Sequence, residues 1–442
     1  MLKQGTTERT VGAALRGRPW FWHGVQGALA SDSANPIKTT GGHGGPPLQY
    51  VLLALLLLSA CGGKVITETE AKPQPPAPKP PASVPMWLGS TSRNFYGTGP
   101  WSDAPLQVVW SFETKGIAGR LHKDPWGGSS WPGQPSVDEN HVYFGSADGR
   151  LYCLDAKDGS LVWSYKTEDS LKATPTIAGD RLIASGLDHN IYCLDKKTGT
   201  LIWKYKTGFE VDCSAAVIDN RIYFGGEDGF FYSLNLDDGT LIYKTERLGS
   251  MEGSFSVVEG RAYIGTEQGD LYCLNLADGS TVWKARIGAD SDSTPAVYEG
   301  KVYTAAENGY VYCFSQTDGQ LLWKYKAEGG TGKEKSGFWA SPIVANGRVH
   351  IGSSNGYLYC LTADTGEVVW RYRAKAAIWG TSPLVDGRLV FGDKSGWIHS
   401  VSADDGQPIS SLKIGDNINA TPAILGGRIY IGAFNGKLYC LK

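Results

Sequence analysis

A sequence repeat with a period of 40 residues, with one longer step of 47, runs through most of the chain. Seven segments align without gaps, including ADGRLYCLDAKDGSLVW (147–163) and LDHNIYCLDKKTGTLIW (187–203), and a shortened copy, FNGKLYCLK, ends the chain. Self-similarity at this period is typical of folds in which one small unit packs against copies of itself. The fold therefore follows from the structure of a single repeat.

Each repeat contains four short runs of alternating apolar and polar residues, which are typical of β-strands. In the second repeat the runs are ATPTIAG, RLIASGL, NIYCLD and TLIWKYK. Asp-Gly or Asn-Gly pairs, such as Asp148-Gly149 and Asn308-Gly309, separate the second run from the third in most repeats. These pairs favour type I′ hairpin turns, in which both central residues have positive φ. Four antiparallel strands per repeat predict the blade of a β-propeller in an all-β protein.

The two ends of the repeat array complete each other. The last copy lacks its fourth run, and residues 106–114 (LQVVWSFET) form a fourth-type run that belongs to no other repeat. A last blade built from both ends would leave no open sheet edge, and open edges promote aggregation. We therefore predict a single propeller of eight four-stranded antiparallel blades over residues 104–442, with the last blade closed by the N-terminal strand.

The fourth run of most repeats carries a tryptophan at one fixed position. These residues are Trp110, Trp163, Trp203, Trp283, Trp323 and Trp370, with Tyr243 and Ser410 at the equivalent places of two repeats. Together with the pattern LYCLDAKDGSLVW (151–163), they resemble the tryptophan-docking repeat of the quinoprotein alcohol dehydrogenase-like superfamily, that is, of PQQ-like propellers. The resemblance implies a structural blade-docking role for the six tryptophans, each of which would pack between adjacent blades.

One apolar run, residues 50–60 (YVLLALLLLSA), precedes Cys61. It is too short for a membrane-spanning helix, which needs about 20 apolar residues, and it suits the apolar part of an export signal peptide. Residues 58–61 (LSAC) resemble a lipobox, which implies lipidation of Cys61. We predict a signal region over residues 1–60, in which residues 1–49 reflect a gene start placed too early. The alternative is a buried strand beside a chance cysteine.

Residues 61–103 are predicted to form a tether that starts at the lipidated cysteine. Seven prolines fall between residues 64 and 85, a composition that favours extended polyproline conformations and semi-rigid spacers. We therefore expect a lipoprotein of the cell envelope, anchored in the outer membrane and facing the periplasm.

Two branches of the PQQ-like family are compatible with the repeats. Quinoprotein dehydrogenases are large enzymes that bind pyrroloquinoline quinone and calcium, whereas the BamB-like branch comprises single-propeller outer-membrane lipoproteins that support β-barrel assembly without known catalysis. The lipobox, tether and bare propeller resemble the second branch, which implies a non-enzymatic scaffold with no cofactor, monomeric within a complex with an outer-membrane or periplasmic protein. The alternatives are a quinoprotein oxidoreductase that uses the quinone and calcium, and a cell-surface glycan-binding propeller.

Other chemistry finds little support in the sequence. The formal net charge of −2 gives no basic excess for nucleic-acid binding. The seven histidines show no metal-ligand spacing, and no nucleophile elbow, P-loop or dinucleotide fingerprint is present. The adjacent cysteine pair of many quinoprotein dehydrogenases is also missing. The missing pair counts against a quinoprotein enzyme.

Six of the eight cysteines occupy the same position in the third run of their repeats. They are Cys153, Cys193, Cys273, Cys313, Cys360 and Cys440. Equivalent sites in neighbouring blades lie roughly 10 Å apart, beyond the roughly 7 Å that a disulfide allows between Cα atoms. We predict that these cysteines are small buried side chains and not disulfide partners.

Length variation concentrates in the links between the last strand of one blade and the first strand of the next. Two insertions fall there, at 115–134 and 327–340. Such links lie on one face of a propeller, which is therefore the predicted working surface.

Charged and aromatic residues gather in these links. The candidate partner-binding residues are the acidic Asp212, Glu252 and Asp292 and the aromatic Phe338, Trp339, Trp379, Trp126 and Trp131. We interpret them as a groove for a peptide or β-strand, with an acidic side and an aromatic side. Three carboxylates also suit a hard cation such as calcium. The alternative is that the charges are solvated and the aromatic residues cap the core.

Overall fold

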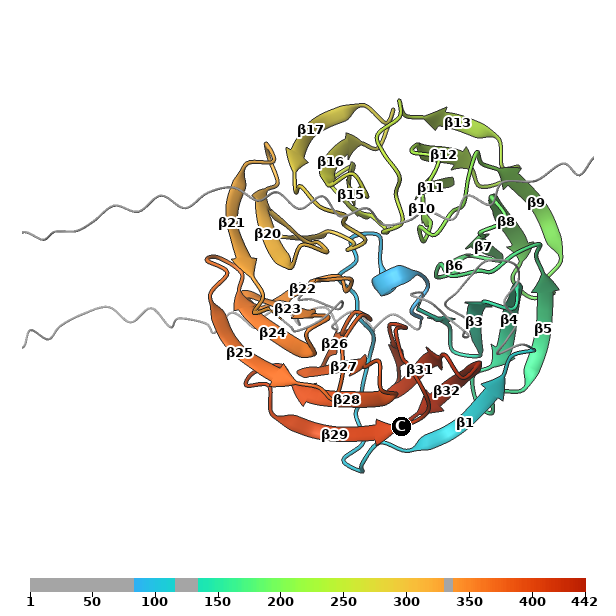
Figure 1. Cartoon of the computed structure of the whole chain (residues 1–442). Helices are drawn as coiled ribbons and strands as arrows, with labels where there is room; N and C mark the ends of the chain where they lie inside the picture. The colour runs from blue at the N-terminus through green and yellow to red at the C-terminus, as the bar shows by residue number, and fades with distance from the viewer. Residues whose placement is uncertain (1–82, 116–133, 330–336) are drawn as a thin grey trace, which may run out of the picture. The chain divides into compact units, whose positions relative to one another are not determined.

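The computed structural model of the protein describes residues 83–115, 134–329 and 337–442. In this part of the chain, 32 strands form eight four-stranded antiparallel sheets arranged in a ring (Figure 1). The predicted all-β, eight-bladed propeller is confirmed. The predicted signal region, Cys61 and the residues up to 82 lie outside the described residues. No helix among the described residues has the length and apolarity that a membrane span requires.

The blades follow the order of the chain. Blade 1 contains β2 (Ser136–Val137), β3 (His141–Ser146), β4 (Arg150–Asp155) and β5 (Leu161–Lys166); blade 2 contains β6 (Thr176–Ala178), β7 (Arg181–Ser185), β8 (Asn190–Asp195) and β9 (Leu201–Lys206). Blade 3 contains β10 (Ala216–Ile218), β11 (Arg221–Gly225), β12 (Phe231–Asn235) and β13 (Leu241–Lys244); blade 4 contains β14 (Ser256–Val258), β15 (Arg261–Gly265), β16 (Asp270–Asn275) and β17 (Thr281–Arg286). Blade 5 contains β18 (Ala296–Tyr298), β19 (Lys301–Ala305), β20 (Tyr310–Ser315) and β21 (Leu321–Lys326); blade 6 contains β22 (Ile343–Ala345), β23 (Arg348–Gly352), β24 (Tyr357–Thr362) and β25 (Val368–Arg373). Blade 7 contains β26 (Leu384–Val385), β27 (Arg388–Gly392), β28 (Trp397–Ser402) and β29 (Pro408–Lys413); blade 8 contains β30 (Ala423–Leu425), β31 (Arg428–Ala433), β32 (Lys437–Leu441) and β1 (Val108–Glu113).

Blade 8 is built from both ends of the repeat array, as predicted. Strand β1 pairs antiparallel with β32, and Trp110 lies opposite Cys440. Figure 1 shows β1 beside β32 at the rim of the ring. This pairing closes the ring without leaving the outer edge of the last blade short of a strand.

The second and third strands of the blades are mostly buried, whereas most fourth strands alternate between exposed and less exposed residues. The repeated cysteine of the third strand lies opposite the repeated tryptophan of the fourth, as in the pairs Cys273–Trp283 and Cys313–Trp323. The seven described cysteines are buried and free, which confirms the prediction for the six repeated ones.

The fourth-strand aromatic residues dock on the following blade. Trp283 donates a hydrogen bond from Nε1 to the carbonyl oxygen of Gln316 at 3.0 Å, and its ring covers Gly319. The same bond is made by Trp110, Trp163, Trp203, Trp323 and Trp370, at 2.9–3.2 Å. Tyr243 replaces it with a bond from its hydroxyl to the carbonyl oxygen of Leu276 at 2.8 Å. The repeat thus carries a constant frame of blade-to-blade contacts.

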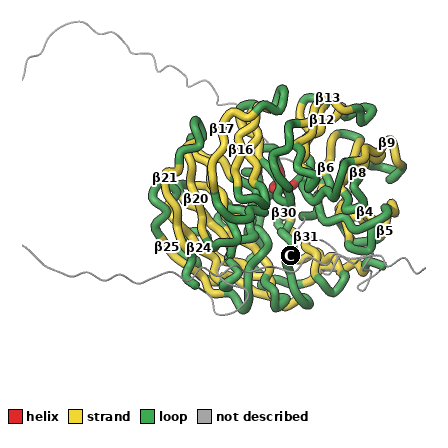
Figure 2. Tube along the Cα trace, turned by 45° about the horizontal axis from the view of Figure 1, so that its top comes forward, coloured by secondary structure: helices red, strands yellow, loops and turns green. Residues whose placement is uncertain are grey.

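The chain joins the propeller earlier than the sequence interpretation placed it. The tether was predicted to extend to residue 103, whereas Val84 already forms a two-way backbone bridge with Val137 of β2. The short 3-10 helix η1 (Trp87–Gly89) lies at the centre of the ring, and the tilted view of Figure 2 places it among the inner strands. Residue Thr98 then bonds to the backbone of Ile424 in β30. The prediction failed because these residues have no repeat partner and follow a proline-rich stretch.

Candidate functional site

The links between blades and the turns between second and third strands lie at the same end of the propeller, because the strands of each blade are antiparallel. At this end, around the axis of the ring, is a recess that opens to solvent, with about 680 Å³ of space when the open mouth is included. Its walls come from the blade-to-blade links, and Trp87 of η1 lines it from the centre. The predicted working face therefore contains a cavity formed by the most variable parts of the repeat.

The recess is lined by residues at one repeated position. This position lies three residues before the residue that directly precedes each first strand, such as Pro175 or Pro295. Successive links place there Lys172, Asp212, Glu252, Asp292, Trp339 and, after blade 7, Asn419, and all six line the recess. Trp379 lines it from the link between blades 6 and 7. A constant backbone position thus carries a different side chain in nearly every blade.

The structure brings five of the eight candidate partner-binding residues together in the recess, namely Asp212, Glu252, Asp292, Trp339 and Trp379. The prediction for Phe338 is wrong, because its side chain is fully buried in the core and packs edge-on against Tyr359. Trp126 and Trp131 lie outside the described residues. Among the described residues, Trp339 and Trp379 therefore form the aromatic side of the recess.

Trp339 and Trp379 form a stacked pair with ring centroids 4.8 Å apart and planes 11° from parallel. Trp379 is 7% exposed and donates from Nε1 to Ser354 Oγ at 3.0 Å. The ammonium of Lys394 lies 3.7 Å from the centroid of the Trp379 ring, in cation–π geometry. Trp379 is thus held by its neighbours, and Trp339 is the half-buried member of the pair that water reaches.

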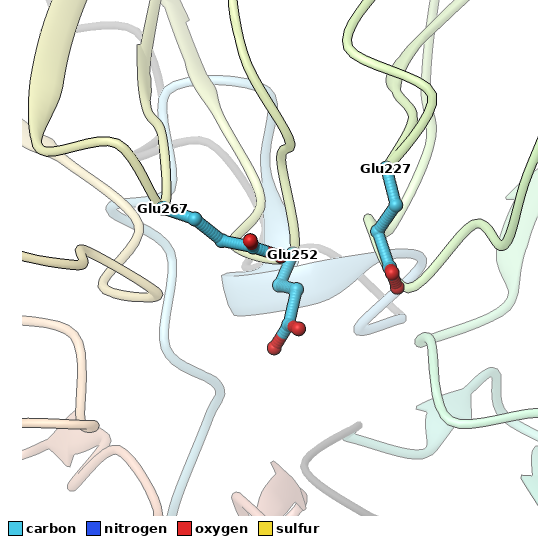
Figure 3. Close-up of side chains that lie close together, drawn as sticks. All are labelled: Glu227, Glu252 and Glu267. Carbon is cyan, nitrogen blue, oxygen red and sulfur yellow. The ribbon is translucent and has the colours of Figure 1, made fainter. Parts of the chain in front are cut away.

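A second repeated position adds to the acidic side. The turns between second and third strands of blades 3, 4 and 5 carry Glu227, Glu267 and Glu307, spaced by one repeat. One carboxylate oxygen each of Glu227, Glu252 and Glu267 lies within 4.8 Å of the other two, and Figure 3 shows these side chains converging from three segments. Asp290, Asp292 and Glu307 form an equivalent triad.

These carboxyl groups are harder to ionise than usual. Glu252 remains exposed and Glu227 and Glu307 are partly exposed, but the surrounding protein displaces much of the water near their carboxyl groups. This desolvation, together with repulsion from neighbouring carboxylates, raises the pKa of Glu227 to about 9, of Glu252 to about 8 and of Glu307 to about 7. The same two causes raise the pKa of Asp290 to about 6 and that of Asp292 well above its usual value. The acidic side therefore holds protons at neutral pH unless a cation stabilises its charge.

Below the recess, Arg93 anchors the N-terminal segment. Its guanidinium is 1% exposed and donates to the backbone carbonyls of Phe255 and Trp87, both at 2.7 Å, and of Ser214 at 3.4 Å. Burial lowers the pKa of Arg93 to about 10. Trp87 in turn donates from Nε1 to Thr294 Oγ1 at 2.9 Å. One buried cation therefore ties η1 to blades 3 and 4, and the indole of Trp87 ties it to the link before blade 5.

The sequence interpretation missed several residues of the site. Lys172 and Asn419 share the repeated position of Asp212, Glu252 and Asp292, and the glutamates of the turns recur at intervals of 40. Comparing every repeat at these two positions would have found them. Trp87 and Arg93 precede the repeats, so no periodic signal marks them.

Three comparisons with known proteins place the chain. A family model described as the β-propeller of the beta-alanine-activating enzyme matches residues 178–442. The chain belongs to this propeller family. No curated protein matches it in sequence.

Solved structures share the fold of this propeller family at low sequence identity. A europium-containing methanol dehydrogenase superimposes with a TM-score of 0.68 at 14% identity, covering 82% of this chain and 98% of that one. Quinohemoprotein alcohol dehydrogenase from Comamonas testosteroni gives 0.67 at 12% identity, covering 81% and 80%. BamB from Moraxella catarrhalis gives 0.52 at 18% identity, covering 76% and 99%. The predicted likeness in fold to PQQ-like propellers is confirmed, and these similarities concern the fold alone.

Proposed function

We propose that the chain is a non-catalytic scaffold that binds a protein partner at the recess. One observation carries this proposal: the stacked pair Trp339 and Trp379 and an acidic arc formed by Asp212, Glu252 and Asp292 line the same cavity. The links between blades vary on this face, whereas the tryptophan contacts between blades at the rim stay constant. Aromatic residues in partly enclosed pockets are the usual energetic centres of protein interfaces. Variable loops on a rigid frame are the usual location of such sites.

The proposal includes a membrane anchor at Cys61. The lipobox-like residues 58–61 and the proline-rich segment that follows support it, because together they would hold the propeller at a fixed reach from the membrane. The partner would then be an outer-membrane or periplasmic protein, such as a component that assembles outer-membrane β-barrels. The likeness in fold to BamB is compatible with this role.

A quinone cofactor does not fit the residues of the recess. Pyrroloquinoline quinone carries three carboxylates, and the recess presents Asp212, Glu252 and Asp292 on one side. The lining cation, Lys172, forms an ion pair with Asp212 at 3.3 Å. The quinone carboxylates would add negative charge beside carboxyl groups that already resist ionisation, which would oppose binding of the quinone. We therefore derive no redox step. Calcium would find oxygen ligands in the two carboxylate triads.

The test is copurification from the host membrane. The tagged full chain is crosslinked lightly, and the captured proteins are identified by mass spectrometry. We expect an envelope protein with a β-barrel or periplasmic repeats. The double variant Trp339→Ala/Trp379→Ala should reduce recovery of that protein at least tenfold. Phe209→Ala serves as the control, since Phe209 is 45% exposed in the link before blade 3 and does not line the recess.

Two results would contradict the proposal. Equal recovery by the double variant, with an unchanged melting temperature, would show that the partner binds elsewhere. Recovery of no envelope protein, with saturable binding of a glycan or the quinone to the purified propeller, would favour one of the alternatives.

A further inference from the structure

We propose that the recess recognises an arginine side chain of the protein partner, whose guanidinium pairs with the acidic arc while its flat face stacks on Trp339. This inference rests on the proposed function and names the chemistry by which the partner is recognised. Asp292 and Trp339 occupy the same repeated position in consecutive links, so the acidic and aromatic sides meet between them.

The first support is charge. The acidic arc consists of Asp212, Glu252 and Asp292 at the links, with Glu227, Glu267, Asp290 and Glu307 close to them. Among the described residues that line the recess, Lys172 is the one cation, and it pairs with Asp212 at the edge of the arc. The arc therefore has more carboxyl groups than the lining cation can pair, and these groups can ionise when a cationic ligand enters.

The second support is unmet hydrogen bonding, which is independent of charge. Asn419 lines the recess and is 1% exposed, and neither its amide oxygen nor its amide nitrogen has a hydrogen-bond partner within the described chain. The buried Oδ1 atoms of Asp290 and Asp292 also have none there. Buried polar atoms in folded proteins are nearly always paired with protein, ordered water or a ligand, so these atoms call for a polar partner inside the recess. A guanidinium offers five N–H donors in one plane.

The third support is the aromatic side. Trp379 already has an ammonium against its ring, and Trp339 stacks on it and remains half-buried. An arginine combines a charge for the carboxylates with a flat surface for an indole, whereas a bare metal ion would use neither tryptophan. The carboxylates also form two triads from neighbouring blades and not a single cage. An organic cation would contact both the carboxylates and the tryptophans, whereas a metal ion would contact the carboxylates alone.

The proposal predicts that binding of the arginine releases protons, which can be measured separately from affinity. Desolvation by the surrounding protein and mutual repulsion raise the pKa values of Glu252 and Glu307 to about 8 and about 7, so the recess without a ligand carries protons at pH 7. A guanidinium placed among these groups lowers their pKa values, and binding must then release protons. Loose attraction of a peptide to carboxylates that are already ionised would release none.

The experiment measures binding of a labelled octapeptide with two arginines to the purified full chain. The matched control peptide carries citrulline in place of each arginine, and citrulline has nearly the same shape but no charge. Calorimetry at pH 7 in phosphate and in Tris buffer gives the protons released. We expect saturable binding that is at least tenfold tighter for the arginine peptide, weakened by salt and accompanied by proton release. Spermidine and calcium chloride are the competitor probes.

The variant Glu252→Gln/Asp292→Asn should weaken binding at least tenfold and reduce the proton release. Glu246→Gln/Glu367→Gln removes the same formal charge from exposed positions outside the recess and should change neither. Equal binding of the citrulline peptide, or unchanged binding by the first variant, would overturn the inference. So would tight binding of calcium or spermidine without binding of the arginine peptide. If the arginine peptide fails while the tryptophan variant still loses the captured partner, the scaffold role stands and the arginine assignment alone is wrong.

Discussion

The rim and the recess of this propeller are built from the same repeats, yet one is constant and the other varies. At the rim, six tryptophans make the same hydrogen bond to the next blade and a tyrosine makes its equivalent. At the recess, one repeated position carries lysine, aspartate, glutamate, tryptophan or asparagine. Positions that hold blades together must all place an aromatic side chain against the next blade. Positions that line the recess share no such requirement.

The two regions should therefore differ in the sign of their effect on stability. Rim residues are apolar, packed and hydrogen-bonded, so changing them should destabilise the fold. The recess holds carboxyl groups that repel one another, so removing their charge should stabilise it. Four changes test this difference.

The largest effect is expected at a rim tryptophan. Trp283→Ala removes an indole that is 8% exposed and its bond to Gln316, and we expect a loss of about 3–5 kcal/mol in the free energy of unfolding. Chemical denaturation measures this loss. Trp283→Tyr should recover part of it, because Tyr243 makes the equivalent bond in blade 3. A loss below about 1 kcal/mol for Trp283→Ala would contradict a structural role for the rim.

The next effect concerns the segment below the recess. Arg93→Met keeps an apolar stem and removes three hydrogen bonds to buried carbonyl oxygens, so we expect a loss of about 2–4 kcal/mol. Arg247→Met, at an exposed position, is the control and should change stability by less than about 0.5 kcal/mol. Equal effects of the two substitutions in denaturant titrations would show that the N-terminal segment does not contribute to the fold.

The constant region was predictable from the sequence for a physical reason. A blade needs four alternating strands, a tight turn with positive φ and an aromatic residue for docking, and each need recurs every 40 residues. The recess was predicted in part, because its acids stand at one repeated position. Phe338 was misassigned because it adjoins Trp339 in the chain. The Phe338 side chain is buried in the core, whereas the Trp339 side chain lines the recess.

The N-terminal segment could not be predicted from the repeats. Trp87 and Arg93 act through contacts with residues more than 100 positions away, such as Thr294 and Phe255. Their local sequence follows a run of prolines, which is typical of a spacer. Only the shape of the closed ring shows that a buried helix and cation fit its centre.

A smaller effect is expected from a matched pair of glycines in blade 5. Gly319 and Gly300 have nearly the same φ, +73° and +74°, but a Cβ at Gly319 would lie 2.6 Å from the Trp283 ring, whereas one at Gly300 would meet nothing within 4 Å. Both alanine variants pay the cost of the left-handed backbone, about 1 kcal/mol. Gly319→Ala should lose about 2 kcal/mol more in thermal or chemical denaturation. Equal losses would mean that the indole can move without cost.

The smallest effect is the pH dependence of the recess, and its sign opposes that of the rim. The raised pKa values of Glu252 and Asp292 mean that the folded state binds more protons than the unfolded state between about pH 4.5 and 8. The free energy of unfolding should therefore fall as the pH rises through this range. Because water reaches the recess, we expect a contribution of about 1 kcal/mol. Glu252→Gln/Asp292→Asn should be more stable than the unsubstituted chain at pH 8 and equal to it at pH 4, whereas Glu246→Gln/Glu367→Gln should follow the unsubstituted chain throughout. Parallel stability curves for all three proteins would show that the acidic arc carries no strain, and the contrast between rim and recess would then be one of sequence alone.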